Sequence, residues 1–249
     1  MVVLDFYELG VVTLFGLLIG SFLNVLIIRI PKEESVVFPA SHCVKCGKNL
    51  KWYHNIPLFS WAFLGGKCAY CKEKISLQYP LIELSTALLF AVSYIKTGDL
   101  VFGFIVGGVF ALLLALSMID FKYLEVPDSL NLLALTLAFA SSADLIENFT
   151  NALLFAGGFS FLRFYVSYLT KKEAMGEADI MIAGTIGAMV GVKLGLVTIF
   201  LSAILALPVF LVAGKKDMEV PFIPFLALAL LIVYIFSDFF QNLLVVLYG

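Results

Sequence analysis

The stretch LVFGFIVGGVFALLLALSMID, residues 100–120, decides the fold class of this chain. Residues 100–119 carry no charged side chain, and about twenty apolar residues in a helix can cross a hydrocarbon core of roughly 30 Å. The run is continuously apolar, whereas a strand of a membrane barrel would alternate between apolar and polar residues. A helix also satisfies its own backbone hydrogen bonds in lipid. The stretch therefore predicts a membrane-spanning helix that ends at the carboxylate of Asp120.

The rest of the chain has the same apolar character. Of its 249 residues, 62% are hydrophobic and 14% are charged, which exceeds the apolar content that a soluble core of this length requires. We predict an all-α polytopic membrane protein with about eight transmembrane helices. Asp5 and Glu8 stand where a signal peptide would have basic residues, so the first helix is expected to stay in place. The expected spans are residues 8–29, 80–97, 100–119, 126–145, 149–169, 177–192, 194–213 and 220–247.

Lysine and arginine are distributed unevenly between the expected loops. They are concentrated in residues 29–74, at residue 122, at residues 171–172 and at residues 215–216, whereas the opposite loops hold Lys96 and Lys193. By the positive-inside rule, the basic loops face the cytoplasm and both termini lie outside. The net charge of -2 and the spread of the basic residues over short loops give no sign of a nucleic-acid surface.

The expected organisation has two parts. Residues 1–79 comprise the first transmembrane helix and a cytoplasmic insert at residues 30–79, and residues 80–249 form a seven-helix membrane bundle. The insert contains all four cysteines, Cys43 and Cys46 in CVKC and Cys68 and Cys71 in CAYC. Two such pairs, 21 residues apart, predict a four-cysteine zinc ribbon. Four thiolates leave no open coordination position, so the zinc is expected to be structural.

Other chemistry is conceivable for the cysteine pairs. A reducing cytoplasm argues against stable disulfides, and no βαβ pattern surrounds the pairs to support a thioredoxin-like redox site. His42 and His54 are expected to be bystanders because four thiolates complete the ligand set, although His42 could replace a displaced cysteine. Gly47 lies next to a pair, where a tight turn is needed.

Acidic residues inside the apolar segments are the candidates for chemistry, because an Asp at the centre of a membrane helix costs about 2.5 to 3.5 kcal/mol. Asp120 ends its span at the negative end of the helix dipole, which a structural role explains poorly. Asp179 is followed by Ile-Met-Ile-Ala inside another span. Both spans have their cytoplasmic ends at these residues, so the two carboxylates are expected to lie at the same depth and to be able to meet.

Two close carboxylates share a proton, so that one activates water while the other protonates the scissile carbonyl, as in aspartic proteases. Asp128 and Glu177 suit the first turns of helices, which favours a structural role for both. Asp238 and Glu83 are not decisive alone. Small residues would allow close helix approach, although they are also common packing devices. They are Gly103 and Gly107 on the span that ends before Asp120, and Gly184, Gly187 and Gly191 on the span that carries Asp179.

A set of motifs covers most of the chain. They are GSFLNVLIIRIP at residues 20–31, NIPLFSW at residues 55–61 between the cysteine pairs, YPLIEL at residues 79–84, ID with a following PD at Asp120 and Asp128, and Gly-x-x-Asp at residues 176–179. Together they resemble the type IV prepilin peptidases, which are bacterial inner-membrane aspartic proteases with a second, methyltransferase activity.

The resemblance implies that the chain cleaves the leader peptide from type IV prepilins or pseudopilins at the cytoplasmic face of the inner membrane. It then implies methylation of the new N-terminus with S-adenosylmethionine. It assigns the catalytic pair to Asp120 and Asp179, with Asp128 as second choice. The sequence departs from the family motif at Ala178, where Gly is typical, and at Ile180 and Met181, where a basic residue often follows.

The methyltransferase site is not located by any glycine-rich nucleotide motif, so that activity rests on the resemblance. Glu83, at the cytoplasmic boundary of the expected second span, is a candidate for holding a sulfonium cation or the incoming amine. The alternative is a first-turn glutamate that complements the helix dipole.

Two other functions remain open from the residues. The first is a proton- or ion-coupled transporter that uses the intramembrane acids. However, no repeated half with paired broken helices is evident, and the favoured acids gather at the cytoplasmic boundary. The second is a zinc-stapled membrane scaffold without chemistry, which would leave Asp120 unexplained.

Overall fold

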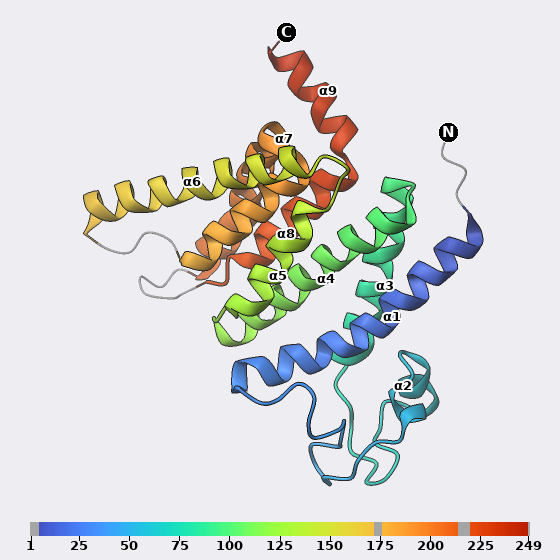
Figure 1. Ribbon diagram of the computed structural model, residues 1–249. Coiled ribbons are helices and arrows are strands. Elements are labelled where there is room, and N and C mark those ends of the chain that lie inside the picture. Colours follow the sequence, from blue (N-terminus) through green and yellow to red (C-terminus); the bar gives the residue numbers. More distant parts are fainter. Residues whose placement is uncertain (1–4, 172–175, 214–219, 249) are drawn as a thin grey trace. The chain divides into compact units, whose positions relative to one another are not determined.

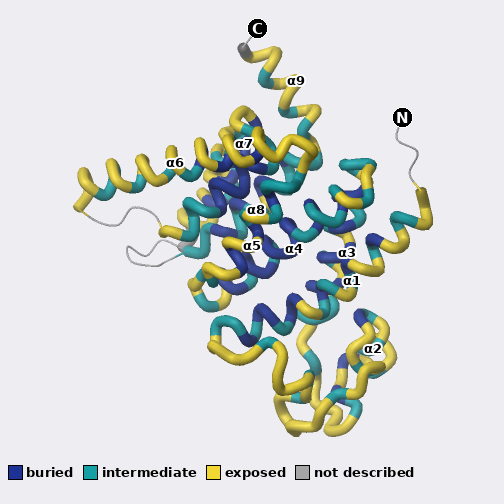
Figure 2. The backbone as a smooth tube through the Cα atoms, in the orientation of Figure 1, coloured by how far each residue is buried: buried dark blue, intermediate teal, exposed yellow. Residues whose placement is uncertain are grey.

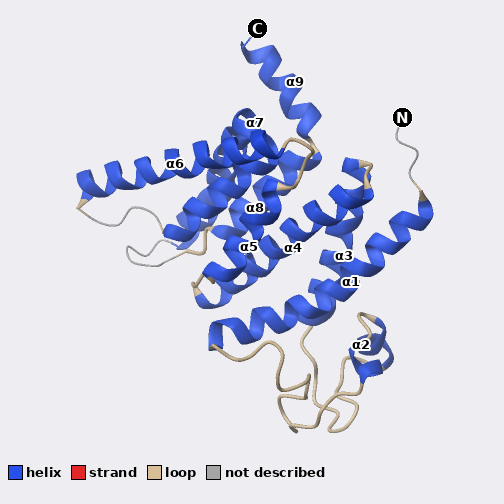
Figure 3. Cartoon of the chain, viewed as in Figure 1, coloured by secondary structure: helices blue, strands red, loops and turns tan. Residues whose placement is uncertain are grey.

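The computed structural model describes residues 5–171, 176–213 and 220–248 (Figure 1). Within these ranges the regular elements are all helices (Figure 3), and extended pairing is limited to two isolated bridges, His42 with Asn49 and Lys67 with Lys74. The all-α prediction is therefore confirmed. Three basic residues used to predict orientation, Lys172, Lys215 and Lys216, lie outside the described residues.

The chain forms two compact units, Met1–Gly107 and Gly108–Gly249. The first unit contains α1 (Phe6–Arg29), α2 (Phe59–Phe63), α3 (Gln78–Thr97) and the beginning of α4 (Leu100–Tyr123). The second unit contains the rest of α4 and the remaining helices. These are α5 (Asp128–Phe139), α6 (Leu145–Thr170), α7 (Glu177–Ala213), α8 (Ile223–Ile235) and α9 (Ser237–Tyr248). The predicted division between residues 79 and 80 stays a prediction.

Four of the described helical segments are long and apolar enough to cross a membrane: Phe6–Lys32, Leu100–Tyr123, Leu145–Thr170 and Glu177–Leu211. A fifth results if α8 and α9, which bend by 83° at their junction, count as one span. These helices are those of a membrane protein. The predicted number of eight spans is not confirmed.

The difference from eight has physical causes in particular helices. α5 has 12 residues, which is too short to cross the hydrocarbon core by itself. The predicted spans 177–192 and 194–213 are joined in one 37-residue run, α7. Gly191 interrupts this run with a positive φ of 73°, a backbone conformation that glycine adopts without a steric penalty.

In the first unit, α1 packs against α3 through two glycines on α1. A Cβ atom at Gly16 would lie 2.8 Å from the Cα of Ala87, and one at Gly20 would lie 2.7 Å from the Cα of Glu83. The two backbones therefore touch at positions where no larger residue fits, as is common between membrane helices.

Two glycines of α4, Gly103 and Gly107, contact the neighbouring helix α3. A Cβ atom at Gly103 would lie 3.0 Å from the Cα of Tyr94, and one at Gly107 would lie 2.7 Å from the ring of Phe90. The predicted close helix approach is confirmed at both positions. These glycines pack α4 against α3, so they are structural residues and do not line a site.

In the second unit, α7 packs against α5, α6 and α8. A Cβ atom at Gly187 would lie 2.5 Å from the carbonyl oxygen of Asn151 on α6, so this glycine also permits close approach. By contrast, α6 is exposed along much of its length (Figure 2). In its most apolar stretch of 18 residues, only 11% of the residues are buried. Its exposed rings, which include Phe161 and Phe164, suit contact with lipid.

Candidate functional site

Asp120 lies in the last turn of α4 and is 6% exposed. Its Oδ2 atom accepts a hydrogen bond from the backbone N–H of Ile223 at 3.0 Å, and the N–H of Phe222 also interacts with the carboxylate. Ile223 is the first residue of α8, so the carboxylate sits at the positive end of a second helix. This contact compensates for the unfavourable position of Asp120 at the negative end of its own helix.

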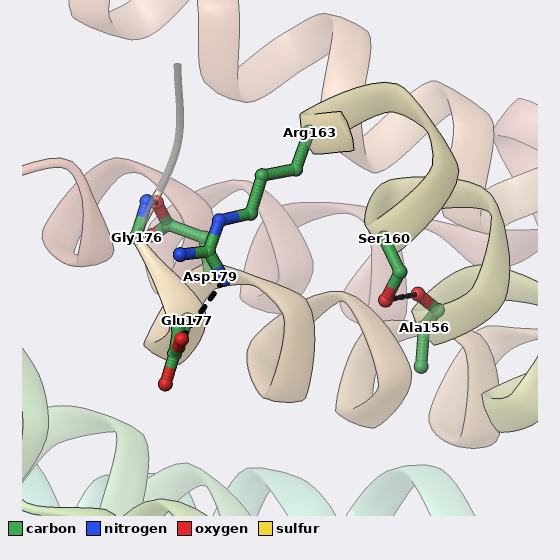
Figure 4. A network of polar contacts seen from close by, with 6 residues as sticks. All are labelled: Ala156, Ser160, Arg163, Gly176, Glu177 and Asp179. Atoms are coloured by element: carbon green, nitrogen blue, oxygen red, sulfur yellow. Dashed lines mark hydrogen bonds and ion pairs between the residues drawn. The ribbon is translucent and has the colours of Figure 1, made fainter. Parts of the chain in front are cut away.

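Asp179 lies in the first turn of α7 and is partly exposed. Its Oδ2 atom accepts a hydrogen bond from the backbone N–H of Gly176 at 3.3 Å (Figure 4). The backbone before α7 thus curls back toward this carboxylate. Asp179 therefore has a local hydrogen-bond donor and remains accessible from outside the protein.

The carboxylates of Asp120 and Asp179 interact electrostatically within the second unit. Two acids that are 59 positions apart in the chain are thus brought near one another by the packing of α7 and α8 in the same unit. Two carboxylates within hydrogen-bonding distance share a proton, which is the basis of acid and base chemistry by such pairs. The sequence analysis predicted that these two acids meet as a catalytic pair, and that assignment stays a prediction.

Glu177 and Asp128 have different surroundings. Glu177 is in the first turn of α7, as expected, and its Oε1 atom forms an ion pair with Nη1 of Arg163 on α6 at 3.1 Å (Figure 4). Its side chain is 80% exposed, and exposed ion pairs contribute little to stability. Asp128 is the exposed first residue of α5, which agrees with the predicted helix start after Pro127.

Asn131 is a residue beside the acid pair that the sequence analysis did not identify. It is fully buried in α5, and its Nδ2 atom donates a hydrogen bond to the carbonyl oxygen of Ala178 at 3.0 Å. Its Oδ1 atom is buried without a hydrogen-bond partner among the described residues. The sequence feature that could have identified it is a single amide side chain in the apolar run DSLNLLAL, one turn after Asp128. This contact fixes the turn of α7 that carries Asp179.

Glu83 lies in the first unit and is 7% exposed. Its Oε2 atom accepts a hydrogen bond from the backbone N–H of Leu58 at 2.7 Å, and the Ser21 side chain also contacts the carboxylate. α3 begins at Gln78, so Glu83 is in the second turn. The alternative of a first-turn glutamate that complements the helix dipole is therefore wrong.

The four cysteines of the insert come together. The Sγ atoms of Cys43, Cys46, Cys68 and Cys71 all lie within 4.8 Å of one another, and those of Cys43 and Cys71 are 3.8 Å apart. Thiolates bound to one zinc at 2.3 Å would be separated by about 3.8 Å. All four thiols are free, and the Cys43–Cys71 separation is far beyond a disulfide bond length. The cluster can therefore hold a metal ion.

Each cysteine pair forms the same kind of turn. The N–H of Cys43 donates to the carbonyl of Lys48, and the N–H of Cys68 donates to the carbonyl of Glu73. Gly47 has the positive φ expected of it at 66°. The backbone N–H groups of Cys71 and Tyr70 lower the pKa of Cys68 to about 6, against the effect of burial. The pKa of Cys71 is raised to about 11 in the same cluster, because thiols this close together do not all lose their protons without a cation.

Two family models match this chain. Residues 14–97, which include the cysteine cluster and Glu83, match the model described as the bacterial peptidase A24 N-terminal domain. Residues 107–211, which include Asp120 and Asp179, match the model of the type IV leader peptidase family. Each of the two sites therefore falls within a different matched region.

Curated relatives named prepilin leader peptidase/N-methyltransferase are similar over nearly the whole chain. The chain is 33% identical to one from Xanthomonas campestris pv. campestris over 90% of this chain and 89% of that protein. It is 34% identical to one from Pseudomonas aeruginosa over 90% and 89%, and 31% identical to one from Bacillus subtilis over 92% and 95%. No solved structure matches this chain.

Proposed function

Because this chain belongs to the type IV leader peptidase family, we propose that it removes the leader peptide from type IV prepilins or pseudopilins and then N-methylates the new N-terminal residue. The names of relatives that match over about nine tenths of the chain support both activities. These relatives give no support to the alternative of a proton- or ion-coupled transporter.

For leader cleavage, we propose Asp120 and Asp179 as the catalytic pair. The observation that supports this assignment is geometric: the buried carboxylate of Asp120 accepts from the N–H of Ile223 at the start of α8, and α8 packs against α7, whose first turn carries Asp179. One ionised carboxylate accepts a proton from water as the water oxygen attacks the scissile carbonyl, and the protonated carboxylate gives its proton to the carbonyl oxygen. Collapse of the tetrahedral intermediate then breaks the C–N bond, and a proton passes to the leaving amine.

The order of the two activities follows from their chemistry. In the precursor, the nitrogen that receives the methyl group is part of the peptide bond that links the leader to the mature protein. An amide nitrogen is a poor nucleophile, whereas the amine released by cleavage can displace a methyl group from a sulfonium. Cleavage therefore precedes methylation in this proposal.

For the membrane arrangement, we propose that the chain lies in the bacterial inner membrane with residues 30–79 and the acid pair at the cytoplasmic face. The concentration of basic residues in residues 29–74 supports this orientation. The shorter apolar helices, such as α5, would complete a bundle of about eight membrane helices, with the first helix and the insert in residues 1–79 and the remaining bundle in residues 80–249.

For the insert, we propose that the four thiolates hold one zinc ion. The spacing of the sulfur atoms and the absence of disulfides among them support this ligand set. When bound, zinc in a site of four thiolates supplies structural stabilisation and no reactive coordination position. The cysteines would thus join the two CxxC turns of a segment with little core of its own.

For methyl transfer, we propose S-adenosylmethionine as the donor, on the basis of the relatives' names. Glu83 stays the candidate for holding the sulfonium cation or the incoming amine by its charge. Its carboxylate already accepts a hydrogen bond from Leu58, so a bound cation would approach the lone pairs that this contact leaves available. The partners of the chain would be prepilins and membrane lipid, with no role for nucleic acid.

The proposed function can be tested with purified protein in detergent, without an ion gradient. A leader-bearing prepilin and S-adenosylmethionine are added, and the products are analysed by mass spectrometry. We expect loss of the leader mass, followed by the gain of one methyl group. An unchanged precursor mass with folded protein would contradict the proposal. Omission of S-adenosylmethionine should stop methylation and spare cleavage.

A further inference from the structure

The segment of residues 55–66, NIPLFSWAFLGG, is the apolar part of the insert. It lies between the cysteine pairs and carries no charged side chain. Two of its aromatic residues are largely exposed, with Phe59 at 60% and Phe63 at 87%. A contiguous exposed apolar surface of this kind is unusual on a protein that faces water and marks a contact with lipid or another protein.

The segment lies against the membrane helix α1. An open groove of about 270 Å³ separates them, with Leu14, Leu17 and Leu18 on the α1 side and Ile56 and Phe59 among the residues on the other side. Leu18 precedes the end of α1 at Arg29 by 11 residues, which is about 16 Å along a helix. The groove therefore lies beside a part of α1 that belongs inside a hydrocarbon core roughly 30 Å thick.

A buried carboxylate fastens the segment at this level. The N–H of Leu58 donates to Oε2 of Glu83 at 2.7 Å, and Glu83 faces Gly20 across the contact between α1 and α3. Gly20 is nine residues before Arg29, so this hydrogen bond is about 14 Å from the end of α1. An irregular backbone at this depth needs such an internal partner, because lipid offers none.

The rest of the segment also pairs its backbone internally. Within and around α2, several N–H groups donate to carbonyl groups three to five residues earlier, so few are left to require water. The donor and acceptor pairs include Ser60 with Ile56, Ala62 with Leu58, Leu64 with Ser60, Gly65 with Ala62, and Gly66 with Trp61.

We propose that residues 55–66 are embedded in the membrane as a re-entrant segment, in the leaflet on the side of the C-terminal end of α1, with Phe59 and Phe63 in contact with lipid acyl chains. Lipid is the partner because Leu14 and Leu18 are exposed residues of a helix that is long and apolar enough to cross a membrane. Acyl chains that cover these two leucines also contact the segment on the other side of the groove. Under this proposal, the rest of residues 30–79 lies at the cytoplasmic face and residues 55–66 enter the membrane from that side. The proposal does not depend on the acid pair.

The two tryptophans of the chain, Trp52 and Trp61, allow a direct test because both lie in or beside the segment. Both are replaced by Phe, and a single Trp is introduced at Phe63. The matched control places the single Trp at Val44, which is also 87% exposed but lies between Cys43 and Cys46. The full chain is placed in phosphatidylcholine vesicles with brominated acyl chains, and fluorescence is compared with that in vesicles of unbrominated lipid.

We expect the brominated lipid to quench most of the emission of the Phe63→Trp protein and little of that of the Val44→Trp protein. Acrylamide in the aqueous phase should quench the two proteins in the opposite order. Strong acrylamide quenching at Phe63→Trp without quenching by bromine would overturn the proposal. Protection from both quenchers would also overturn it, because protein would then cover the segment. If Phe63→Trp fails to fold, Trp52→Phe, which leaves Trp61 inside the segment, provides the same measurement.

Discussion

Each of the two compact units buries one acid against a backbone N–H group. In the first unit, Glu83 is 7% exposed and accepts from Leu58 at 2.7 Å, and in the second, Asp120 is 6% exposed and accepts from Ile223 at 3.0 Å. The difference is that Asp120 also interacts with a second acid, Asp179, whereas the further contact of Glu83 is the Ser21 side chain. Burial against a backbone N–H group is therefore common to both acids, and the second carboxylate is the feature that distinguishes Asp120 from Glu83.

The largest expected effect is the loss of leader cleavage in Asp120→Asn and in Asp179→Asn. Each substitution removes a group that exchanges a proton in the reaction, and such groups contribute about 10²- to 10⁴-fold to a rate. The cleavage rate is measured with a fluorescent prepilin in detergent. If either variant kept a rate within a few-fold of the unmodified protein, the acid pair would lose its proposed role.

The next largest effect concerns the cysteine cluster. Cys71→Ser removes one of four thiolates, so we expect zinc to fall from about one per chain to well below one. Elemental analysis of protein purified without a chelator measures the zinc content, and Val44→Ala, between the other two cysteines, is the control. Zinc at full occupancy in Cys71→Ser, or its absence from the unmodified protein, would reject the four-thiolate site.

A moderate effect is expected at Glu83, where two substitutions separate anchoring from charge. Glu83→Leu leaves the N–H of Leu58 without its acceptor, which costs about 1–3 kcal/mol and lowers the thermal midpoint. Glu83→Gln keeps an acceptor oxygen and removes the charge, so it should remain stable and cleave the leader, but methylate less. Wild-type methylation by Glu83→Gln would leave Glu83 with the anchoring role alone.

The smallest effects are expected for Asp128→Asn and Glu177→Gln. Both residues are exposed, and the ion pair of Glu177 with Arg163 contributes within about 1 kcal/mol. Cleavage rates should therefore stay close to those of the unmodified protein. A loss as large as that of Asp120→Asn would show that the pair has been assigned to the wrong acids.

The sequence predicted the helical class because apolar runs such as residues 100–119 leave little choice in lipid. It also predicted the clustering of the four cysteines, since the spacing within each pair fixes a turn. The number of spans was less predictable, because hydropathy does not show that residues 177–213 continue through Gly191 as one kinked run. Hydropathy also cannot determine whether a 12-residue helix such as α5 spans the membrane alone or packs as part of the bundle.

The candidate site was predictable in its acids and not in its surroundings. Asp120 and Asp179 stand out because charge is costly at the ends of apolar helices. The contacts of Asp120 with Ile223 and of Asn131 with Ala178 join residues that are 103 and 47 positions apart. No local pattern encodes such contacts, because they depend on how the helices of the second unit pack. The hydrogen bond from Leu58 to Glu83 could not be predicted for the same reason.

The central claim is that the acid pair of the second unit performs cleavage and is separate from methylation. The most direct test supplies Asp179→Asn and S-adenosylmethionine with two substrates, the intact prepilin and the same pilin with its leader already removed. Mass spectrometry of both products should show an intact precursor that keeps its leader and a precleaved pilin that gains one methyl group. Removal of the leader by Asp179→Asn would contradict the claim.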